Sequence, residues 1–167
     1  YHSLWTYQRL LSPVDAGYGE VYRSVQDPIT PLAYAAAVTS RIRLGVAVVN
    51  LPFVAPVVLA KQLATVDVLS GGRLDAGLGN GWSPEEFVAT GATKRGQGRR
   101  AEEFIAVLRR LWTEDVVEFH GEFYQIPRMR MDPKPVQRPH PPILLGGAAE
   151  PALRRAGRLC DGWVSSS

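Results

Sequence analysis

The chain has 167 residues, of which 46% are hydrophobic and 21% charged, and its formal net charge is +3. This balance is ordinary for a globular domain with a sizeable core, and no apolar run of about 18 residues indicates a membrane span. The basic residues are spread over expected helices, so the charge predicts no nucleic-acid partner. The single cysteine, Cys160, excludes a disulfide framework and favours a cytoplasmic protein with a buried, unreactive thiol.

Strand and helix signals alternate from the N-terminus onward. Residues 3–7 form a short apolar and aromatic run. After a loop rich in Pro and Gly, Thr30 and Pro31 are typical of a helix start, and the Ala-rich stretch that follows predicts a helix to residue 39. The first residues include neither Met nor a basic region, so they do not resemble a signal peptide and suggest a chain entered in mid-domain.

The next segments predict a βαβ unit. Residues 41–49 are apolar almost throughout, as expected for a strand buried on both faces. Residues 56–69 carry apolar side chains at helical spacing and end at two glycines, and residues 73–79 are typical of another strand. Two strands joined by a crossover of about 20 residues are expected to be parallel. Ser83 then begins a short helix as its expected N-cap.

The C-terminal half continues the alternation. Residues 98–112 give the clearest helix, because its apolar residues form one stripe: Ala101, Phe104, Ile105, Leu108, Leu111 and Trp112. Residues 113–141 are expected to be an irregular excursion within a single domain that covers residues 1–167. A strand at 142–145, a helix from 150 and a strand at 162–165 complete the pattern. Such alternation permits either a (β/α)8 barrel, which needs about 250 residues, or an open doubly wound sheet.

Two glycine-rich turns follow expected strands. The first, residues 77–82, departs from the G-x-G-x-x-G dinucleotide fingerprint because Trp82 stands at the sixth position. It is either a tight strand-to-helix turn or a place where backbone approaches a flat ring. The second, residues 146–149, is either an ordinary turn or a phosphate site, because small residues there expose backbone N–H groups at a helix start.

Function is expected to collect where the strands end. Residues 5–9 and 50–53 follow strands, and the carboxyl ends of parallel strands share one edge of a sheet. His2, His120 and His140 match no metal-binding spacing, and the sequence contains neither a nucleophile elbow nor a Walker A motif. We therefore expect no metal site, and the chemistry of an enzyme built on this chain would belong to a bound cofactor.

The order and spacing of several segments resemble one known family. The segments are RIRLGVAVV (41–49), LSGGR (69–73), DAGLGNGW (75–82), KPVQ (134–137) and DGW (161–163). Together they strongly resemble luciferase-like monooxygenases, most closely the actinobacterial subgroup that uses coenzyme F420, over essentially the whole chain. The resemblance implies a luciferase-like (β/α)8 TIM barrel in the α/β class, incomplete, with about five of the eight strands present. It also implies coenzyme F420, as the first choice, or FMN.

The resemblance further implies three groups of cofactor-binding residues. They are a backbone bulge at Ala47, Val48, Val49 and Asn50, a ring-side contact at Asn80, Gly81 and Trp82, and a phosphate contact at Gly147, Ala148 and Ala149. A cis peptide bond that does not precede proline is typical of the family at the bulge. All three groups should meet at one rim, with Trp5 also near the ring.

Two departures from the family pattern limit what can be carried over. Several F420-dependent members have Asp-His where this chain has Gln8-Arg9, so no catalytic acid or base is assigned. Arg9 is a candidate for holding an anionic or carbonyl substrate or part of the cofactor, and a surface salt bridge is the alternative. The first strand and the last two or three are expected to be missing. Open sheet edges would then be completed by a homo-oligomer or a partner chain.

Three hypotheses follow. The first is an oxidoreductase that acts on a small organic substrate, by hydride transfer through F420 or oxygen insertion through FMN, without nucleic-acid or membrane partners. The second is a cofactor-free barrel fragment that serves as a binding or assembly module. The third is a Rossmann-type NAD(P) protein, against which Trp82 counts.

Overall fold

The computed structural model describes residues 1–15, 17 and 19–165. Eight strands lie in this part of the chain. The central sheet has six strands, which are β1 (Ser3–Thr6), β2 (Arg43–Val46), β3 (Val49–Asn50), β4 (Leu74–Gly79), β7 (Ile143–Gly146) and β8 (Gly162–Val164). The other two, β5 (Val117–His120) and β6 (Gln125–Met129), form a separate antiparallel hairpin.

The strands of the central sheet are arranged in chain order. They lie as β1-β2-β4-β7-β8, with β3 beside β4, and every pair is parallel. A doubly wound sheet reverses its direction of growth at a switch point, whereas a barrel grows in one direction only. Over residues 1–15, 17 and 19–165 this sheet grows in one direction and does not close, so the structure has the architecture of a partial (β/α) barrel.

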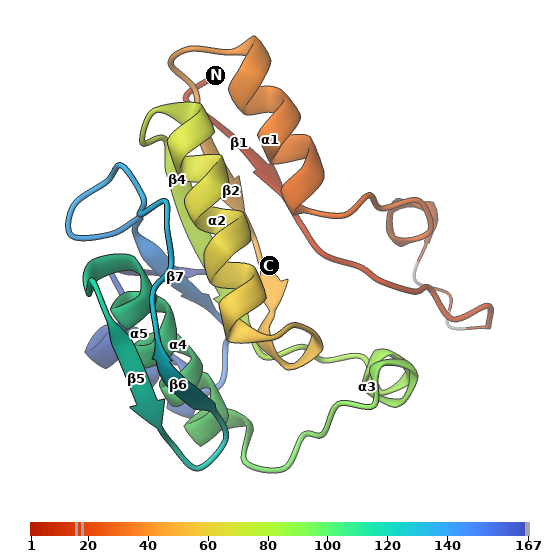
Figure 1. Cartoon of the computed structure of the whole chain (residues 1–167). Coiled ribbons are helices and arrows are strands. Elements are labelled where there is room, and N and C mark those ends of the chain that lie inside the picture. Colours follow the sequence, from red (N-terminus) through yellow and green to blue (C-terminus); the bar gives the residue numbers. More distant parts are fainter. Residues whose placement is uncertain (16, 18, 166–167) are drawn as a thin grey trace.

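Helices connect most of the strands that follow one another along the chain, and all but the third of them cover one face of the sheet, whereas the third lies away from it (Figure 1). They are α1 (Ile29–Val38), α2 (Pro56–Ser70), α3 (Pro84–Thr90), α4 (Gln97–Thr113) and α5 (Glu150–Leu159), with 3-10 turns η1 (Glu20–Tyr22) and η2 (Leu51–Phe53). Figure 1 shows α1 and α2 side by side across the sheet, and α2 also contacts α4, which contacts α5. The strand side chains that face this layer form the core and are Leu44, Val46, Leu74, Ala76, Leu78, Ile143 and Leu145.

The helix α4 confirms the apolar stripe that its sequence predicts. All six stripe residues are buried, and Trp112 additionally donates from Nε1 to the Ala60 carbonyl of α2 at 3.0 Å. Gly71 ends α2 with φ +66°, as its position in the sequence indicates. The start of α1 differs from the expectation. Asp27 accepts hydrogen bonds from the amides of Ile29 and Thr30, so the helix begins at Ile29 and Asp27, not Thr30, provides the cap.

The segment 113–141 is more regular than expected. It contains the β5–β6 hairpin, whose turn is held by one carboxylate from α4: Glu103 accepts the backbone N–H groups of Glu122, Phe123 and Tyr124 at 2.8–3.3 Å. The strands are short, and their register shifts between Val117 and Phe119. This irregularity breaks the period-two alternation that would have indicated strands in the sequence.

Two of the most specific sequence segments stabilise the amino end of β4. The fully buried carboxylate of Asp67 accepts the amides of Val136 (2.7 Å) and Gln137 (3.0 Å) and the Gln137 side-chain N–H (2.7 Å). The Arg73 guanidinium donates to carbonyls and a hydroxyl in residues 36–42 at 2.9–3.0 Å. The segments at 69–73 and 134–137 therefore organise the end of the sheet opposite the expected site.

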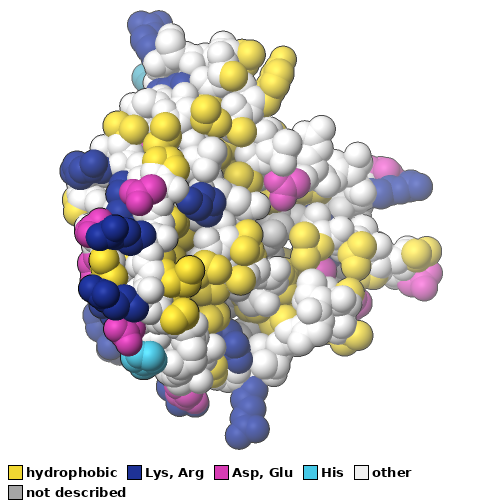
Figure 2. All heavy atoms as spheres, in the orientation of Figure 1, with side chains coloured by type: hydrophobic (Ala, Val, Ile, Leu, Met, Phe, Trp, Pro, Cys, Tyr) yellow, Lys and Arg dark blue, Asp and Glu magenta, His cyan; other side chains and the backbone are white. Residues whose placement is uncertain are grey.

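Charged and uncharged side chains occupy different parts of the surface that faces the viewer. Figure 2 shows charged side chains gathered mainly along the edge formed by the β5–β6 hairpin, while the middle of this face carries mostly hydrophobic and uncharged atoms. Among the described residues, no helix has both the length and the apolar character needed to cross a membrane.

Candidate functional site

The carboxyl ends of β3, β4 and β7 meet at one edge of the sheet. Asn50 is in register with Gly79, and Leu78 is in register with Leu145. The segments that follow these strands therefore start beside one another. This arrangement brings the three expected groups, residues 47–50, 80–82 and 147–149, to one rim.

A backbone bulge interrupts the sheet between β2 and β3. The peptide bond between Ala47 and Val48 is cis, which places it within the segment where the resemblance implies it. The Val48 side chain then lies across two glycines. A Cβ added at Gly79 would lie 2.4 Å from Val48 Cγ2, and one at Gly146 would lie 2.9 Å from Val48 Cγ1. Because only glycine allows this approach, Val48 forms a raised, partly exposed apolar surface over the ends of β4 and β7.

Two glutamine side chains fix the backbone of the rim. Gln8 Oε1 accepts the backbone N–H of Asn50 at 2.8 Å, and Gln97 Nε2 donates to the carbonyl of Asn80 at 2.9 Å. Neither glutamine was among the expected site residues. Gln8 lies in the segment after the first strand, which does point to the rim. Gln97 stands at the start of α4, where the sequence carries no such signal.

The turn after β4 has the tight geometry expected of its glycines. Gly81 has φ +72°, and a Cβ added there would lie 3.2 Å from the Phe53 ring and 3.3 Å from the Phe87 ring. Trp82, which follows, is 53% exposed, and its carbonyl accepts a hydrogen bond from Lys94 Nζ at 3.1 Å. The indole therefore stands at the side of the rim with part of its surface open.

Arg9 is buried rather than displayed at the rim. Its side chain is 3% exposed, and Nη1 lies 3.2 Å from Glu86 Oε2, whose side chain is 2% exposed. The salt bridge considered from the sequence thus exists, but inside the protein and not on its surface. Glu86 thus compensates the charge of Arg9, and the Arg9 guanidinium carbon lies 4.5 Å from the centroid of the Trp82 ring at the rim.

The turn after β7 carries only small side chains. Gly147 has φ +130°, and Ala148 and Ala149 are exposed. Ala149 precedes α5, and its carbonyl accepts the first helical amide bonds, from Ala152 and Leu153. Pro151 has no N–H and the Ala152 amide is already bonded, so the N–H groups that this turn can offer to an anion are those of Ala148, Ala149 and Glu150. The Gly147 carbonyl is already occupied by Trp163 Nε1 at 2.8 Å.

Trp5 lies on the face of the sheet that the helices leave uncovered. Its indole covers Gly45 on β2, where an added Cβ would come within 2.3 Å of the ring. Trp5 Nε1 donates to Ser3 Oγ at 2.8 Å, and the side chain is 41% exposed.

A cavity of about 400 Å³ lies next to the rim, lined in part by Phe53, Arg100 and Tyr124.

The rim residues 47–50, 80–82 and 147–149 include no ionisable side chain. Glu85, an exposed carboxylate three residues after Trp82, has its pKa lowered, chiefly by the hydrogen bond that Ser83 Oγ donates to it at 2.6 Å. The described part of the chain contains no cluster of His, Cys, Asp and Glu that could hold a metal ion. The described rim residues thus present backbone groups and apolar side chains.

Comparisons with known sequences identify relatives. The model of the family described as luciferase-like monooxygenase matches residues 1–167. An uncharacterized protein of Mycobacterium tuberculosis is 44% identical over 128 residues, which cover 77% of this chain and 43% of that protein. The FMNH(2)-dependent dimethylsulfone monooxygenase of Pseudomonas putida is 36% identical over 154 residues, which cover 90% and 42%.

Solved structures resemble this fold. Monooxygenase RslO1 from Streptomyces bottropensis matches with a TM-score of 0.79 and 37% identity, over 91% of this chain and 44% of that one. An F420-dependent secondary alcohol dehydrogenase, solved with an F420-acetone adduct, matches with a TM-score of 0.84 over 99% of this chain and 49% of that one. Because the sequence identity is only 18%, this match shows a shared fold and nothing more. The chain thus spans less than half the length of each of these relatives.

Proposed function

The chain belongs to the luciferase-like monooxygenase family, and we propose that it supplies the ring-binding part of a monooxygenase that uses reduced FMN to oxidise a small organic substrate. The observation that carries the proposal is the position of Val48 across Gly79 and Gly146. It creates an apolar platform at the rim where the three strand ends meet. A planar ring could rest on such a platform, because no side chain from β4 or β7 rises above it.

The other rim residues fit the remaining parts of FMN. The backbone of Asn80 and Gly81 and the indole of Trp82 would border the ring, and the turn at Gly147 and Ala148 would receive the phosphate. When bound, reduced FMN supplies the electrons with which dioxygen is activated. The chain's own residues bind and orient the ring, and the Gln8–Asn50 and Gln97–Asn80 hydrogen bonds keep the backbone in place for it.

Two observations favour FMN over coenzyme F420. Reduction of a carbonyl by hydride transfer needs a proton donor at the substrate oxygen, and the described rim residues include none: Gln8 is committed to the Asn50 amide and Arg9 to Glu86. In addition, two relatives above 30% identity whose names give a cofactor are FMNH(2)-dependent. Hydride transfer through F420 is the second candidate, supported by the similar fold of F420-dependent enzymes.

Cofactor titration tests the proposal. Purified chain is titrated separately with oxidised FMN and oxidised F420 while tryptophan emission is recorded, with Trp82→Phe as the matched variant. We expect FMN to quench the emission, and the quenched fraction to fall in the variant because Trp82 borders the ring. Quenching by F420 with none by FMN would overturn the FMN assignment. Quenching by neither would favour the alternative of a cofactor-free binding or assembly module.

The sheet has edge strands that could pair with further strands, and such strands would complete the barrel around the site. Among the described residues β1 and β8 each pair on one side only, and the family relatives are about twice as long. We expect further parallel strands, from a homo-oligomer or a partner chain, to complete the barrel. Sedimentation equilibrium checks this: a mass above the 18.3 kDa of one chain supports a homo-oligomer. A monomer that binds FMN as tightly as its relatives would contradict the need for completion.

A further inference from the structure

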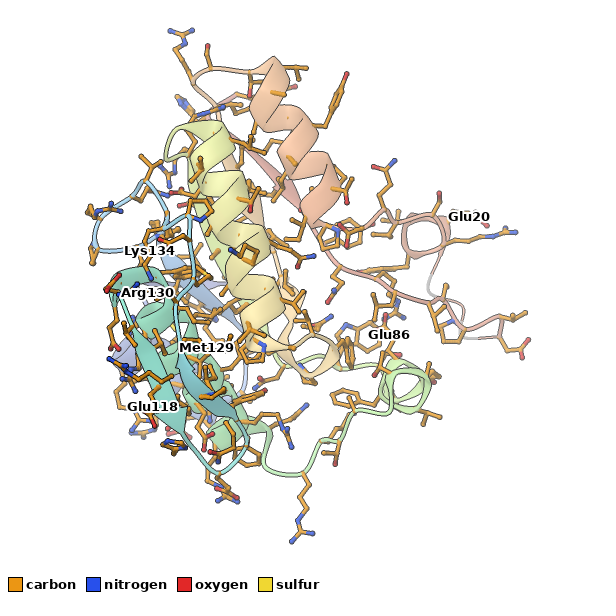
Figure 3. All side chains as sticks on the ribbon, in the orientation of Figure 1. Glu20, Glu86, Glu118, Met129, Arg130 and Lys134 are labelled. Carbon is orange, nitrogen blue, oxygen red and sulfur yellow. The ribbon has the colours of Figure 1, made fainter. Side chains whose placement is uncertain are left out.

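A buried carboxylate joins two segments that border the rim. Glu86 lies on α3, on the side that faces the segment after β1 (Figure 3). Its Oε2 pairs with Arg9 Nη1 at 3.2 Å, and its Oε1 accepts the backbone N–H groups of Leu10 at 2.7 Å and Leu11 at 3.4 Å. One side chain therefore holds the segment after β1 against α3, across 75–77 residues of sequence.

The arginine held by Glu86 covers a tryptophan of the rim. The Arg9 guanidinium carbon lies 4.5 Å from the centroid of the Trp82 ring and 5.7 Å from that of the Tyr22 ring. A planar guanidinium stacks well on an indole, and the attraction strengthens when the pair is shielded from water. Arg9 is shielded, since its side chain is 3% exposed. The position of the Trp82 indole therefore depends on where Arg9 is held.

We propose that Glu86 is a positioning residue, which fixes Arg9 on Trp82 and thereby holds the indole as the side wall of the ring site. This inference rests on the proposed function, because that function makes Trp82 a neighbour of the ring. The physical reason is the cost of burying an unpaired charge. Without the Glu86 carboxylate, Arg9 loses this ion pair. We then expect its guanidinium to shift on Trp82, so that ring binding has to order a side wall that is no longer held in place.

The variants separate positioning from simple support of the fold. Glu86→Gln keeps the size of the side chain and an oxygen for the amides of Leu10 and Leu11, but it removes the charge that Arg9 needs. Arg9→Lys keeps the charge and removes the planar group that stacks. Glu85→Gln is the matched control, because Glu85 is the adjacent carboxylate on the same helix and is exposed, and because its removal takes away a negative charge that attracts Arg9 while the Glu86 ion pair stays in place.

The first measurement needs no cofactor. The fluorescence emission of Trp82 is obtained as the difference between each protein and the same protein carrying Trp82→Phe. Its quenching by acrylamide is then compared among proteins whose circular dichroism spectra show that they are equally folded. We expect Glu86→Gln and Arg9→Lys to raise the accessibility of Trp82, and Glu85→Gln to leave it unchanged. The second measurement is FMN binding, for which the first two variants should raise Kd about tenfold.

The outcomes distinguish this inference from the proposed function. Suppose that the wild-type chain binds FMN. The positioning role is then wrong if Glu86→Gln and Arg9→Lys have the same Trp82 accessibility and the same Kd for FMN as the control Glu85→Gln. If wild-type chain binds neither FMN nor F420, the proposed function fails, whatever the acrylamide result. If Glu86→Gln does not fold, Arg9→Lys still decides, because it leaves the carboxylate in place for the two amides.

Discussion

The Val48 side chain lies so closely over Gly79 that a methyl group on Gly79 would come within 2.4 Å of Val48 Cγ2. Val48 lies in the bulge between β2 and β3, and Gly79 ends β4. Valine has a stiff χ1, so its methyl groups cannot easily turn away. The bulge and the end of β4 are thus fitted to each other, and the shape of the platform depends on both.

Gly79→Ala is expected to destabilise the chain by about 1–3 kcal/mol, because the added methyl group forces the bulge away from β4. It should also weaken FMN binding, since the platform moves. Chemical denaturation and cofactor titration measure the two effects. The double variant Val48→Ala with Gly79→Ala removes the clash, so it should recover part of the loss. Strict additivity of the two single substitutions would contradict the fit described above.

Ala148→Asp tests the phosphate turn. A carboxylate at this exposed position would repel a phosphate held by the amides before α5, and we expect the Kd for FMN to rise about tenfold. Ala148→Asn has nearly the same shape without the charge and serves as the control. The two should differ more at low salt than at high salt, because screening weakens the repulsion. Equal affinities of the two variants would move the phosphate elsewhere.

Much of the fold follows from local patterns in the sequence. The apolar stripe of α4 and the glycine that ends α2 depend on residues within a few turns of one another. Strand and helix therefore alternate in the sequence as they do in the structure. The strand order needed the structure, because alternation alone permits both a barrel and a doubly wound sheet. The hairpin in 113–141 was missed because its short strands lose their alternation at the register shift.

The candidate site also has a part that the sequence predicts and a part that it does not. The three backbone segments of the rim could be predicted, because glycine-rich turns after parallel strands share an edge and because they match the family. The side chains that fix them could not. Glu86 reaches Arg9 across 77 residues and Gln97 reaches Asn80 across 17, and both contacts arise from the packing of α3 and α4. No periodicity or motif in a single sequence indicates such pairs.

Asp67→Asn is expected to destabilise the fold by about 2–4 kcal/mol. The Asp67 carboxylate is fully buried and accepts three N–H groups from residues 136–137, and an amide in its place turns a donor toward some of them. The control is Asp115→Asn, because Asp115 is exposed and forms only a surface ion pair with Arg130. Urea denaturation gives both values. Equal stability of the two variants would show that the 134–137 segment is not held through Asp67.

The raised pKa of His120 leads us to expect a small pH dependence of the free energy of unfolding. Its pKa is raised, first by the hydrogen bond to Glu118 and then by that to Gln125. The protonated ring is therefore favoured in the folded chain. This contribution is fully present below the unfolded pKa of about 6.5 and is lost as the pH rises through the folded pKa. Imidazole resonances followed by NMR should titrate above that of a model peptide. In His120→Gln, this part of the pH dependence of unfolding should disappear.

Cys160 should react slowly with thiol reagents. Burial is the main cause that raises its pKa to about 11, although the nearby charge of Arg109 opposes the rise. At pH 8 its thiolate fraction is then about two orders of magnitude below that of a free cysteine, and alkylation by iodoacetamide should be slower to a similar degree. The same chain in urea serves as the control, because unfolding exposes the thiol and restores ordinary reactivity. Equal rates in the folded and unfolded chain would mean that the end of α5 opens readily and does not shield this residue.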